Sequence, residues 1–161
     1  MIEEICELRH HVWLQAATNV TRQSPKQWRE TIDETATHFI VRSDMGMLVA
    51  SARVSLHRDV SIIPDKDDIV LCFPDWSPDL PIAWLNRLVV HPSARSAGLG
   101  TRCDQERIKW AKQAGALAIG GTVIGWRKQS FLKMGFEELG EIPGHVHGKY
   151  DEPTYLIVMA L

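Results

Sequence analysis

The stretch Arg87-Leu-Val-Val-His-Pro-Ser-Ala-Arg95-Ser-Ala-Gly98-Leu-Gly100-Thr-Arg102 is the most informative part of this 161-residue sequence. Residues 82–90 are mostly apolar at successive positions, which is typical of a central strand that is buried on both faces. Pro92 blocks further strand pairing. Residues 98–114 carry an apolar stripe at helical spacing that stops at Gly115. The stretch therefore predicts a strand, a loop with two glycines and a long helix.

A loop in this position is suited to binding an anion. The N-terminus of a helix presents free backbone N–H groups and a partial positive charge. Gly98 and Gly100 allow a ligand to approach the backbone closely, and Arg95 and Arg102 add charge of the kind that binds phosphate. These residues predict a site for a phosphate or a pyrophosphate.

Two common phosphate-binding motifs do not fit the stretch. A Walker A loop needs Gly-Lys-Ser/Thr, whereas Gly100 is followed by Thr101-Arg102. A dinucleotide fingerprint needs a third glycine where Cys103 stands. The residues alone leave open a phosphate-binding protein of another kind.

The rest of the chain alternates between helices and strands. This order predicts an α/β or α+β fold, with a mixed sheet on which helices pack. The strand pair at 38–57 is expected to form a hairpin with one buried face, and the connection at 58–81, which has four prolines, is expected to be a long loop. We expect helices at 2–17, 24–35, 98–114 and 127–134, and strands at 38–43, 47–57, 82–90, 116–124, 136–141 and 154–161.

The composition is that of an ordinary globular domain, with 45% hydrophobic and 24% charged residues. We expect one domain over residues 1–161. The net charge of −2 argues against a nucleic-acid partner, and the absence of an apolar run near 20 residues argues against a membrane span. The acidic N-terminal segment without a long apolar run leads us to expect no secretory signal. Three widely spaced cysteines argue against a disulfide framework or a Cys-based zinc site and favour a reducing, cytoplasmic location.

The pattern Arg-x-x-Gly-x-Gly at Arg95, Gly98 and Gly100 resembles the acyl-CoA pyrophosphate loop of the GCN5-related N-acetyltransferase (GNAT) superfamily. The strand Leu88-Val89-Val90 precedes it, and Phe131-Leu-Lys-Met-Gly135-Phe136 is similar to the short helix and the Gly-Phe strand entry of that family. The order of elements also matches, so that the resemblance covers nearly the whole chain. It implies a mixed, mostly antiparallel central sheet flanked by helices. The family's first strand is expected to be missing or short, because the sequence begins almost directly in a helix.

The resemblance implies an N-acetyltransferase that uses acetyl-CoA, or another acyl-CoA, as its co-substrate. An amine of a small molecule or a peptide attacks the thioester directly, and no metal takes part. The oxyanion is stabilised by a backbone N–H of the central strand, here that of Val89, and a homodimer is common in the family. The residues expected to bind CoA are Leu88, Val89, Val90, Arg95, Ser96, Ala97, Gly98, Leu99, Gly100 and Thr101.

The residues that deprotonate the amine and protonate the leaving thiolate are less well defined. His145 and His147 are expected as catalytic residues because the family's acceptor site often includes the loop between the last two strands, although both also fit a solvated loop. Further candidates for the base are His57, Glu138 and Asp151. Phe131 stands where many family members carry a tyrosine that acts as the general acid. This departure favours an alternative function, a CoA-binding sensor or partner-binding module without efficient catalysis.

Arg53 and Arg87 lie inside otherwise apolar strands. A buried guanidinium needs a partner, and the two alternatives are an internal salt bridge and a carboxylate of the acceptor substrate. The segments around them, together with Leu8-Arg9-His10-His11-Val12-Trp13, also resemble acyl-homoserine-lactone synthases and their relatives. That similarity leaves acyl groups longer than acetyl open.

Overall fold

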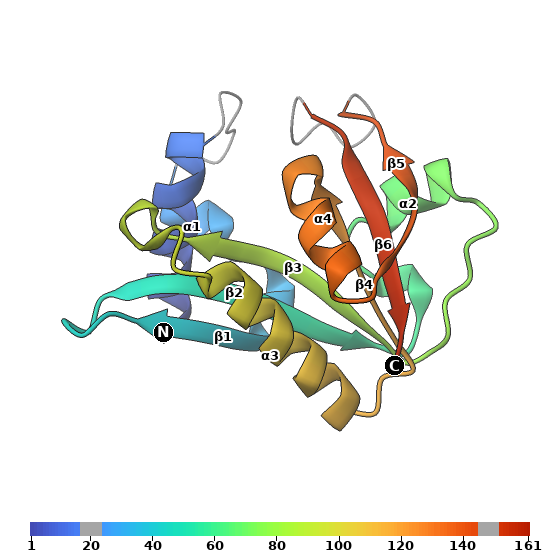
Figure 1. Cartoon of the computed structure of the whole chain (residues 1–161), viewed down its shortest axis with the longest axis horizontal. Helices are drawn as coiled ribbons and strands as arrows, with labels where there is room; N and C mark the ends of the chain where they lie inside the picture. Colours follow the sequence, from blue (N-terminus) through green and yellow to red (C-terminus); the bar gives the residue numbers. More distant parts are fainter. Residues whose placement is uncertain (17–23, 145–151) are drawn as a thin grey trace. The chain divides into compact units, whose positions relative to one another are not determined.

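The computed structural model describes residues 1–16, 24–144 and 152–161 (Figure 1). The chain forms two compact units: Met1–Ser55 with Asn86–Lys109, and Leu56–Leu85 with Trp110–Leu161. Strand β3 (Ile82–Val90) begins in the second unit and ends in the first. The hydrogen-bonded strands follow the order β1-β2-β3-β4-β6-β5.

The first unit places two helices on opposite faces of its strands. Strands β1 (Thr37–Arg42) and β2 (Leu48–His57, which enters the second unit at Leu56) form an antiparallel hairpin and lie side by side in Figure 1. Helix α1 (Ile2–Ala16) packs its apolar side chains against Ile40 and Val89. Helix α3 (Leu99–Gln113, which enters the second unit at Trp110) contributes Cys103 to a cluster that includes the neighbouring strand positions. Because side chains alternate along a strand, neighbouring residues of β1 and β3 face different helices.

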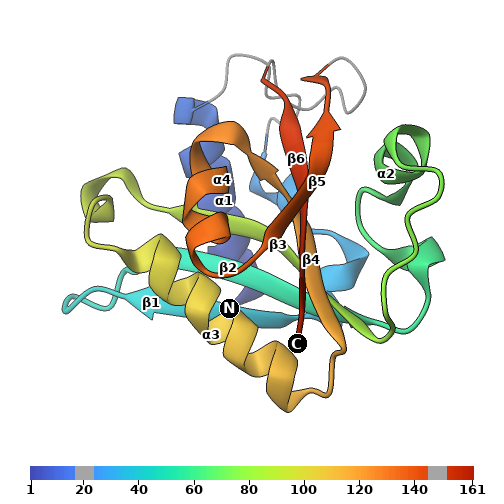
Figure 2. The same cartoon turned by 45° about the vertical axis from the view of Figure 1, so that its right-hand side comes forward.

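The second unit is built on three strands and the start of β3. Residues Ile82–Leu85 run parallel to β4 (Ala118–Ile124), which pairs antiparallel with β6 (Thr154–Ala160), and β6 pairs antiparallel with β5 (Glu137–Ile142). Helix α4 (Gly125–Lys133) lies beside β4 and β6, and the short helix α2 (Lys66–Cys72) lies beside β5 (Figure 2). The core of this unit is an apolar cluster formed by Ile63, Ile69, Ile82, Trp84, Ala118, Ile142 and Leu156.

The structure confirms the mixed, mostly antiparallel sheet flanked by helices that the sequence predicts. All six expected strands and three of the four expected helices lie within about two residues of their predicted bounds. Within the described residues the first element of the chain is α1, so that no strand precedes it.

The helix expected over residues 24–35 is wrong. This segment forms two short 3₁₀ helices, η1 (Pro25–Trp28) and η2 (Thr31–Glu34), with Arg29 and Glu30 extended between them. The side chain of Asp33 accepts the backbone N–H of Glu30 at 2.9 Å, which closes the first turn of η2. This interruption between η1 and η2 is stabilised because the carboxylates of Glu30 and Asp33 then reach the buried Arg53.

The expectation that the hairpin has one buried face is also wrong. The polar positions Ser51, Arg53, Ser55 and His57 are between 0% and 5% exposed, as buried as the apolar positions between them. Strand β2 lies between β1 and β3 in the sheet. Arg53 is tolerated there because protein carboxylates surround its guanidinium.

The connection at 58–81 is not a plain loop. It contains a 3₁₀ turn, η3 (Val60–Ile62), and the seven-residue helix α2, whose Ile69 is 1% exposed in the core. Asp67 and Asp68 occupy the first turn of α2, where the helix dipole favours negative charge. The four prolines of the connection indicated a loop. The helix itself could not be predicted because a seven-residue segment is too short for a clear periodic pattern.

Candidate active site

The loop between β3 and α3 has the backbone geometry of an anion site. We call residues 95–101 the Gly-rich loop. Within it Ser96 (φ 68°) and Gly98 (φ 71°) are both left-handed. The N–H of Arg102 donates to the carbonyl of Gly98 at 3.0 Å. The N–H groups of residues 99–101 therefore precede the first intrahelical bond, as the first donors of any helix do.

The Gly-rich loop is open and positively charged. A Cβ built on Gly98 would meet no protein atom within 4 Å. Arg95 and Arg102 are exposed, and so are Ser96 and Ala97. The loop therefore offers free N–H groups, open space at a glycine and two cations, which is the donor set that a pyrophosphate needs.

The end of β3 departs from a regular strand. Its parallel pairing with β4 covers Ile82–Leu85. Two residues later Arg87 has φ 52°, in the left-handed region. Val89 then packs toward α1 at 3% exposure, whereas Leu88 and Val90 pack in the cluster with Cys103 of α3. Val89 is thus a core side chain, and Leu88 and Val90 are partly buried against a core cluster.

A buried ionic network lies on the α1 side of the same strands. Arg9 is fully buried, and its guanidinium makes two hydrogen bonds to Asp33, at 2.9 and 3.0 Å. Arg53, 1% exposed, donates to Asp33 at 2.7 Å, to Glu30 at 2.8 Å and to the side-chain oxygen of Asn86 at 2.6 Å. Arg53 therefore has the internal ion pairs that the sequence left as one of two alternatives.

The environment of Asp33 stabilises its charged form. Burial raises the pKa of this carboxyl, but hydrogen bonds from Arg9, from the Glu30 N–H and from Arg53 outweigh burial and lower the pKa to about 2. Asp33 is thus an anion between two guanidinium groups, and its negative charge partly compensates the buried positive charges of Arg9 and Arg53.

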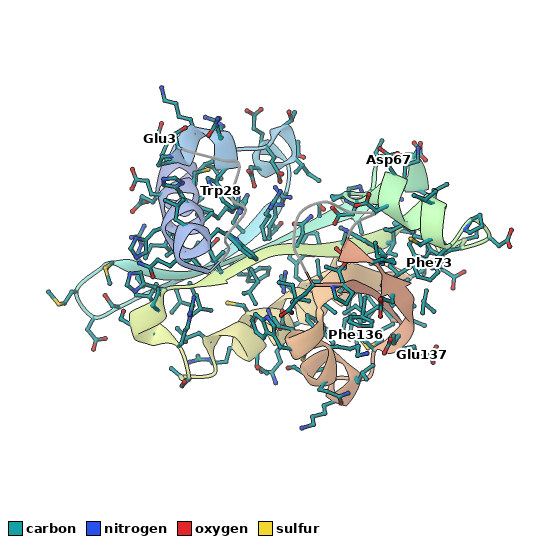
Figure 3. All side chains as sticks on the ribbon, turned by 90° about the horizontal axis from the view of Figure 1, so that it is seen from above. Glu3, Trp28, Asp67, Phe73, Phe136 and Glu137 are labelled. Carbon is teal, nitrogen blue, oxygen red and sulfur yellow. The ribbon has the colours of Figure 1, made fainter. Side chains whose placement is uncertain are left out.

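Arg87 is joined to this network through Glu30. Its Nε donates to Glu30 at 3.0 Å, and its Nη2 is bonded to the other oxygen of the same carboxylate. The guanidinium lies 6.0 Å from the ring of Trp28, which stacks on Trp13 of α1 and is labelled beside that helix in Figure 3. At 20% exposure the Arg87 side chain is more accessible than that of Arg53, at 1%.

Comparison with known proteins decides the family. The profile of the acetyltransferase (GNAT) family matches residues 2–136. The chain belongs to the GNAT acetyltransferase family. It is accordingly an acyltransferase, and acetyl-CoA is the donor that GNAT enzymes use.

Solved structures share the GNAT fold with this chain at low sequence identity. TofI, in a ternary complex with an inhibitor and MTA, gives a TM-score of 0.74 at 14% identity over 99% of this chain and 83% of TofI. The ribosomal-protein-S18-alanine N-acetyltransferase from Escherichia coli gives a TM-score of 0.62 at 15% identity, over 96% of this chain and 86% of that enzyme. A GCN5-related N-acetyltransferase from Kribbella flavida gives a TM-score of 0.58 at 16% identity, over 100% of this chain and 90% of the other. The comparison with curated proteins by sequence gives no match.

Phe131, which the resemblance aligned with a family tyrosine, is 2% exposed. Its ring makes an edge-to-face contact with Phe136, 5.1 Å between centroids, and Phe136 is labelled in Figure 3. The guanidinium of Arg127 lies 5.2 Å from the ring centre of Phe131. The surroundings of Phe131 are thus those of a buried core residue, and the side chain carries no ionisable group.

The structure describes two of the five candidate bases, His57 and Glu138. His145, His147 and Asp151 lie outside the described residues, so their role stays a prediction. His57 is buried, at 4% exposure. Glu138 forms an ion pair with Lys128 at 2.9 Å.

Sequence reasoning missed four polar residues of the buried ionic network. They are Glu30, Asp33, Asn86 and Arg107. Each is hydrogen-bonded to Arg53, which is at least 20 residues away in sequence. The available signal was a pair of carboxylates three residues apart, before two strands that each carry an arginine, because buried guanidinium groups require such partners.

Two observations concern metals and membranes. Within residues 1–16, 24–144 and 152–161, no three His, Cys, Asp or Glu side chains are grouped so as to hold a metal ion. Among the helices of the same ranges, none combines the length and apolar character needed to cross a bilayer.

Proposed function

We propose that this GNAT protein transfers an acetyl or short acyl group from CoA to an amine of a small molecule or a peptide. The observation that supports acyl-CoA as the acyl donor is the geometry of the Gly-rich loop. Its left-handed Gly98 leaves open space, and the first turn of α3 supplies N–H groups beside two exposed arginines. Pyrophosphate is the part of CoA that such a donor set fits.

The proposed reaction is a direct transfer. The amine nitrogen attacks the thioester carbonyl carbon, the carbonyl electrons move to oxygen, and the tetrahedral oxyanion collapses with cleavage of the C–S bond. The amine proton passes to a base, for which His145 and His147 stay the proposed candidates, and CoA leaves as the thiolate. A thiol pKa near 8.5 makes this a fair leaving group even where Phe131 replaces a tyrosine. The backbone N–H of Val89 is the proposed donor to the oxyanion.

Binding of the donor is tested by calorimetric titration with acetyl-CoA and CoA. We expect both to bind the wild type, and Gly98→Trp to abolish binding because an indole fills the space that the pyrophosphate needs. Gly46→Trp is the matched control, since Gly46 is also left-handed (φ 80°) with no atom within 4 Å of a Cβ. Absence of wild-type binding at millimolar ligand would exclude CoA, and retained affinity in Gly98→Trp would refute the placement of the pyrophosphate.

A second function, a CoA-binding sensor with little catalysis, is favoured by the buried Phe131. A thiol-release assay over a panel of small amines and peptide N-termini separates the two. Release of CoA that depends on an added amine supports the transferase, whereas binding without release on any acceptor supports the sensor.

The acceptor is proposed to carry a carboxylate, and Arg87 is the proposed contact because it is the more exposed of the two strand arginines. We propose no nucleic-acid partner, since the net charge is −2. A cytoplasmic location and a homodimer remain proposals that cell fractionation and light scattering test.

A further inference from the structure

Arg87 is the feature of the first unit that most needs an explanation. Three described non-glycine residues have positive φ, and of these Arg87 alone lies inside a strand. The left-handed conformation is costly for a residue with a Cβ. It persists only where the surroundings hold it, and such strain is often part of a functional site.

The side chain of Arg87 is held by a carboxylate. Both oxygens of Glu30 are bonded to its guanidinium, at Nε and at Nη2. This two-point geometry is the strongest form of an arginine–carboxylate pair. Glu30 is itself fixed, because Arg53 donates to it at 2.8 Å and is anchored on Asp33.

The backbone on the other side of Arg87 is held as well. The carbonyl of Asn86 accepts a hydrogen bond from Nη1 of Arg107 at 3.2 Å, and the same Nη1 donates to the carbonyl of Arg53 at 3.0 Å. Arg107 is 1% exposed on α3 and is paired with Asp104. Charged groups from the start of η2 and from α3 therefore fix the residue and the peptide before it.

We propose that Glu30 is a positioning residue for acyl transfer. By binding Arg87 it holds the left-handed break in β3, and this break sets the direction of the N–H groups that follow, including that of Val89. The inference rests on the proposed function, in which that N–H stabilises the oxyanion. A hydrogen-bond donor contributes to this step only when it is already in place.

The first test compares Arg87→Ala with Arg87→Gly. Both lose the guanidinium, but only glycine adopts a left-handed φ without a steric cost. We expect Arg87→Ala to lower kcat by about a hundredfold, and Arg87→Gly to be about tenfold more active than Arg87→Ala. If Arg87 acted only by binding a substrate carboxylate, the two variants would be equal. A general loss of stability predicts the reverse order, since glycine is the poorer strand residue.

The second test removes the charge of Glu30. We expect Glu30→Gln to lower kcat while the Kd for CoA, which depends on the Gly-rich loop, stays unchanged. In an Arg87→Gly background the same substitution should have little further effect, because glycine needs no partner to hold its φ. The matched control is Glu34→Gln in the same segment, where an exposed pair with Arg29 is lost and kcat should not change. Equal losses in both backgrounds would overturn the proposal.

A structural measurement keeps this inference separate from the proposed function. Crystal structures of the wild type and of Glu30→Gln give φ at Arg87 whether or not any acceptor is known. We expect φ to leave the positive region in the variant. A φ that stays positive overturns the proposal, and so does a φ that changes with no loss of kcat. A wild type that releases no thiol refutes the transferase instead, and φ then decides alone whether Glu30 holds the break.

Discussion

At the scale of single residues, the carboxylate of Asp33 is the centre of the buried network. It is 2% exposed and accepts hydrogen bonds from Arg9 and Arg53, which are 0% and 1% exposed. Removal of one partner from a buried ionic group leaves the other charges uncompensated, which is far more costly than loss of a surface pair.

We therefore expect Asp33→Asn to lower the free energy of unfolding by about 3–5 kcal/mol. Chemical denaturation followed by fluorescence measures this difference. Glu34→Gln, which removes an exposed pair in the same segment, should change it by less than about 0.5 kcal/mol. Equal effects of the two variants would contradict the role given to the network.

Acid should weaken the protein through the same residue. The pKa of Asp33 is about 2 in the folded chain, below its ordinary value of 3.8. A carboxyl with a lowered folded-state pKa contributes stability that is present above the ordinary value and is lost as the pH falls toward the folded value. Between pH 3.8 and pH 2 the wild type should lose on the order of 2 kcal/mol that Asp33→Asn does not lose. Parallel curves for the two proteins would show that Asp33 is not the titrating group.

The sequence identified Arg53 and Arg87 because a guanidinium in an apolar strand requires partners. It did not identify Glu30 and Asp33 as those partners. Their local pattern, Ser24-Pro25 followed by mixed residues, predicts one helix. The tertiary contacts of the two carboxylates override that local preference, and the spacing of the carboxylates does not by itself say which arginines they bind.

At the scale of elements, β4 depends on its two glycines. A Cβ at Gly121 would lie 2.8 Å from the backbone oxygen of Leu85, its partner in the parallel pairing with β3. A Cβ at Gly120 would lie 3.0 Å from the carbonyl oxygen of Ile157 and 3.0 Å from the ring of Trp84. The small residues thus let the strand backbones and the Trp84 ring approach closely.

Gly121→Ala should therefore destabilise the protein by about 1–3 kcal/mol, because backbone atoms cannot move aside cheaply. Thermal unfolding measures the effect. Gly125→Ala, at the start of α4, is the control. Its Cβ would lie 3.4 Å from the Tyr155 ring, which is an ordinary van der Waals contact. There alanine should be neutral or stabilising by up to about 1 kcal/mol. A stable Gly121→Ala would mean that the β3–β4 pairing is looser than described.

Elements with a long periodic pattern could be predicted from the sequence, whereas short ones could not. The fifteen residues of α3 and the nine of β3 show clear helical and strand patterns and were predicted to within about one residue. The turns η1, η2 and the helix α2 have four, four and seven residues. Capping and side-chain contacts, rather than periodicity, decide such segments.

At the scale of the whole molecule, the net charge of −2 conceals a local basic site. Arg95 of the Gly-rich loop and Arg102 of α3 are both exposed, and the left-handed Gly98 between them leaves open space. The motif in this loop, together with the strand before it, the helix after it and the Gly135-Phe136 segment, predicts the GNAT family, which the match over residues 2–136 confirms. The acceptor could not be predicted, because acceptor-site residues vary with the substrate and carry no motif in this chain.

A crystal structure with bound acetyl-CoA would show where the pyrophosphate and the thioester bind. We expect the pyrophosphate to accept hydrogen bonds from the N–H groups of the Gly-rich loop, and the thioester oxygen to face the N–H of Val89. A pyrophosphate bound elsewhere, or a thioester distant from the break at Arg87, would contradict the proposed acyl-transfer site.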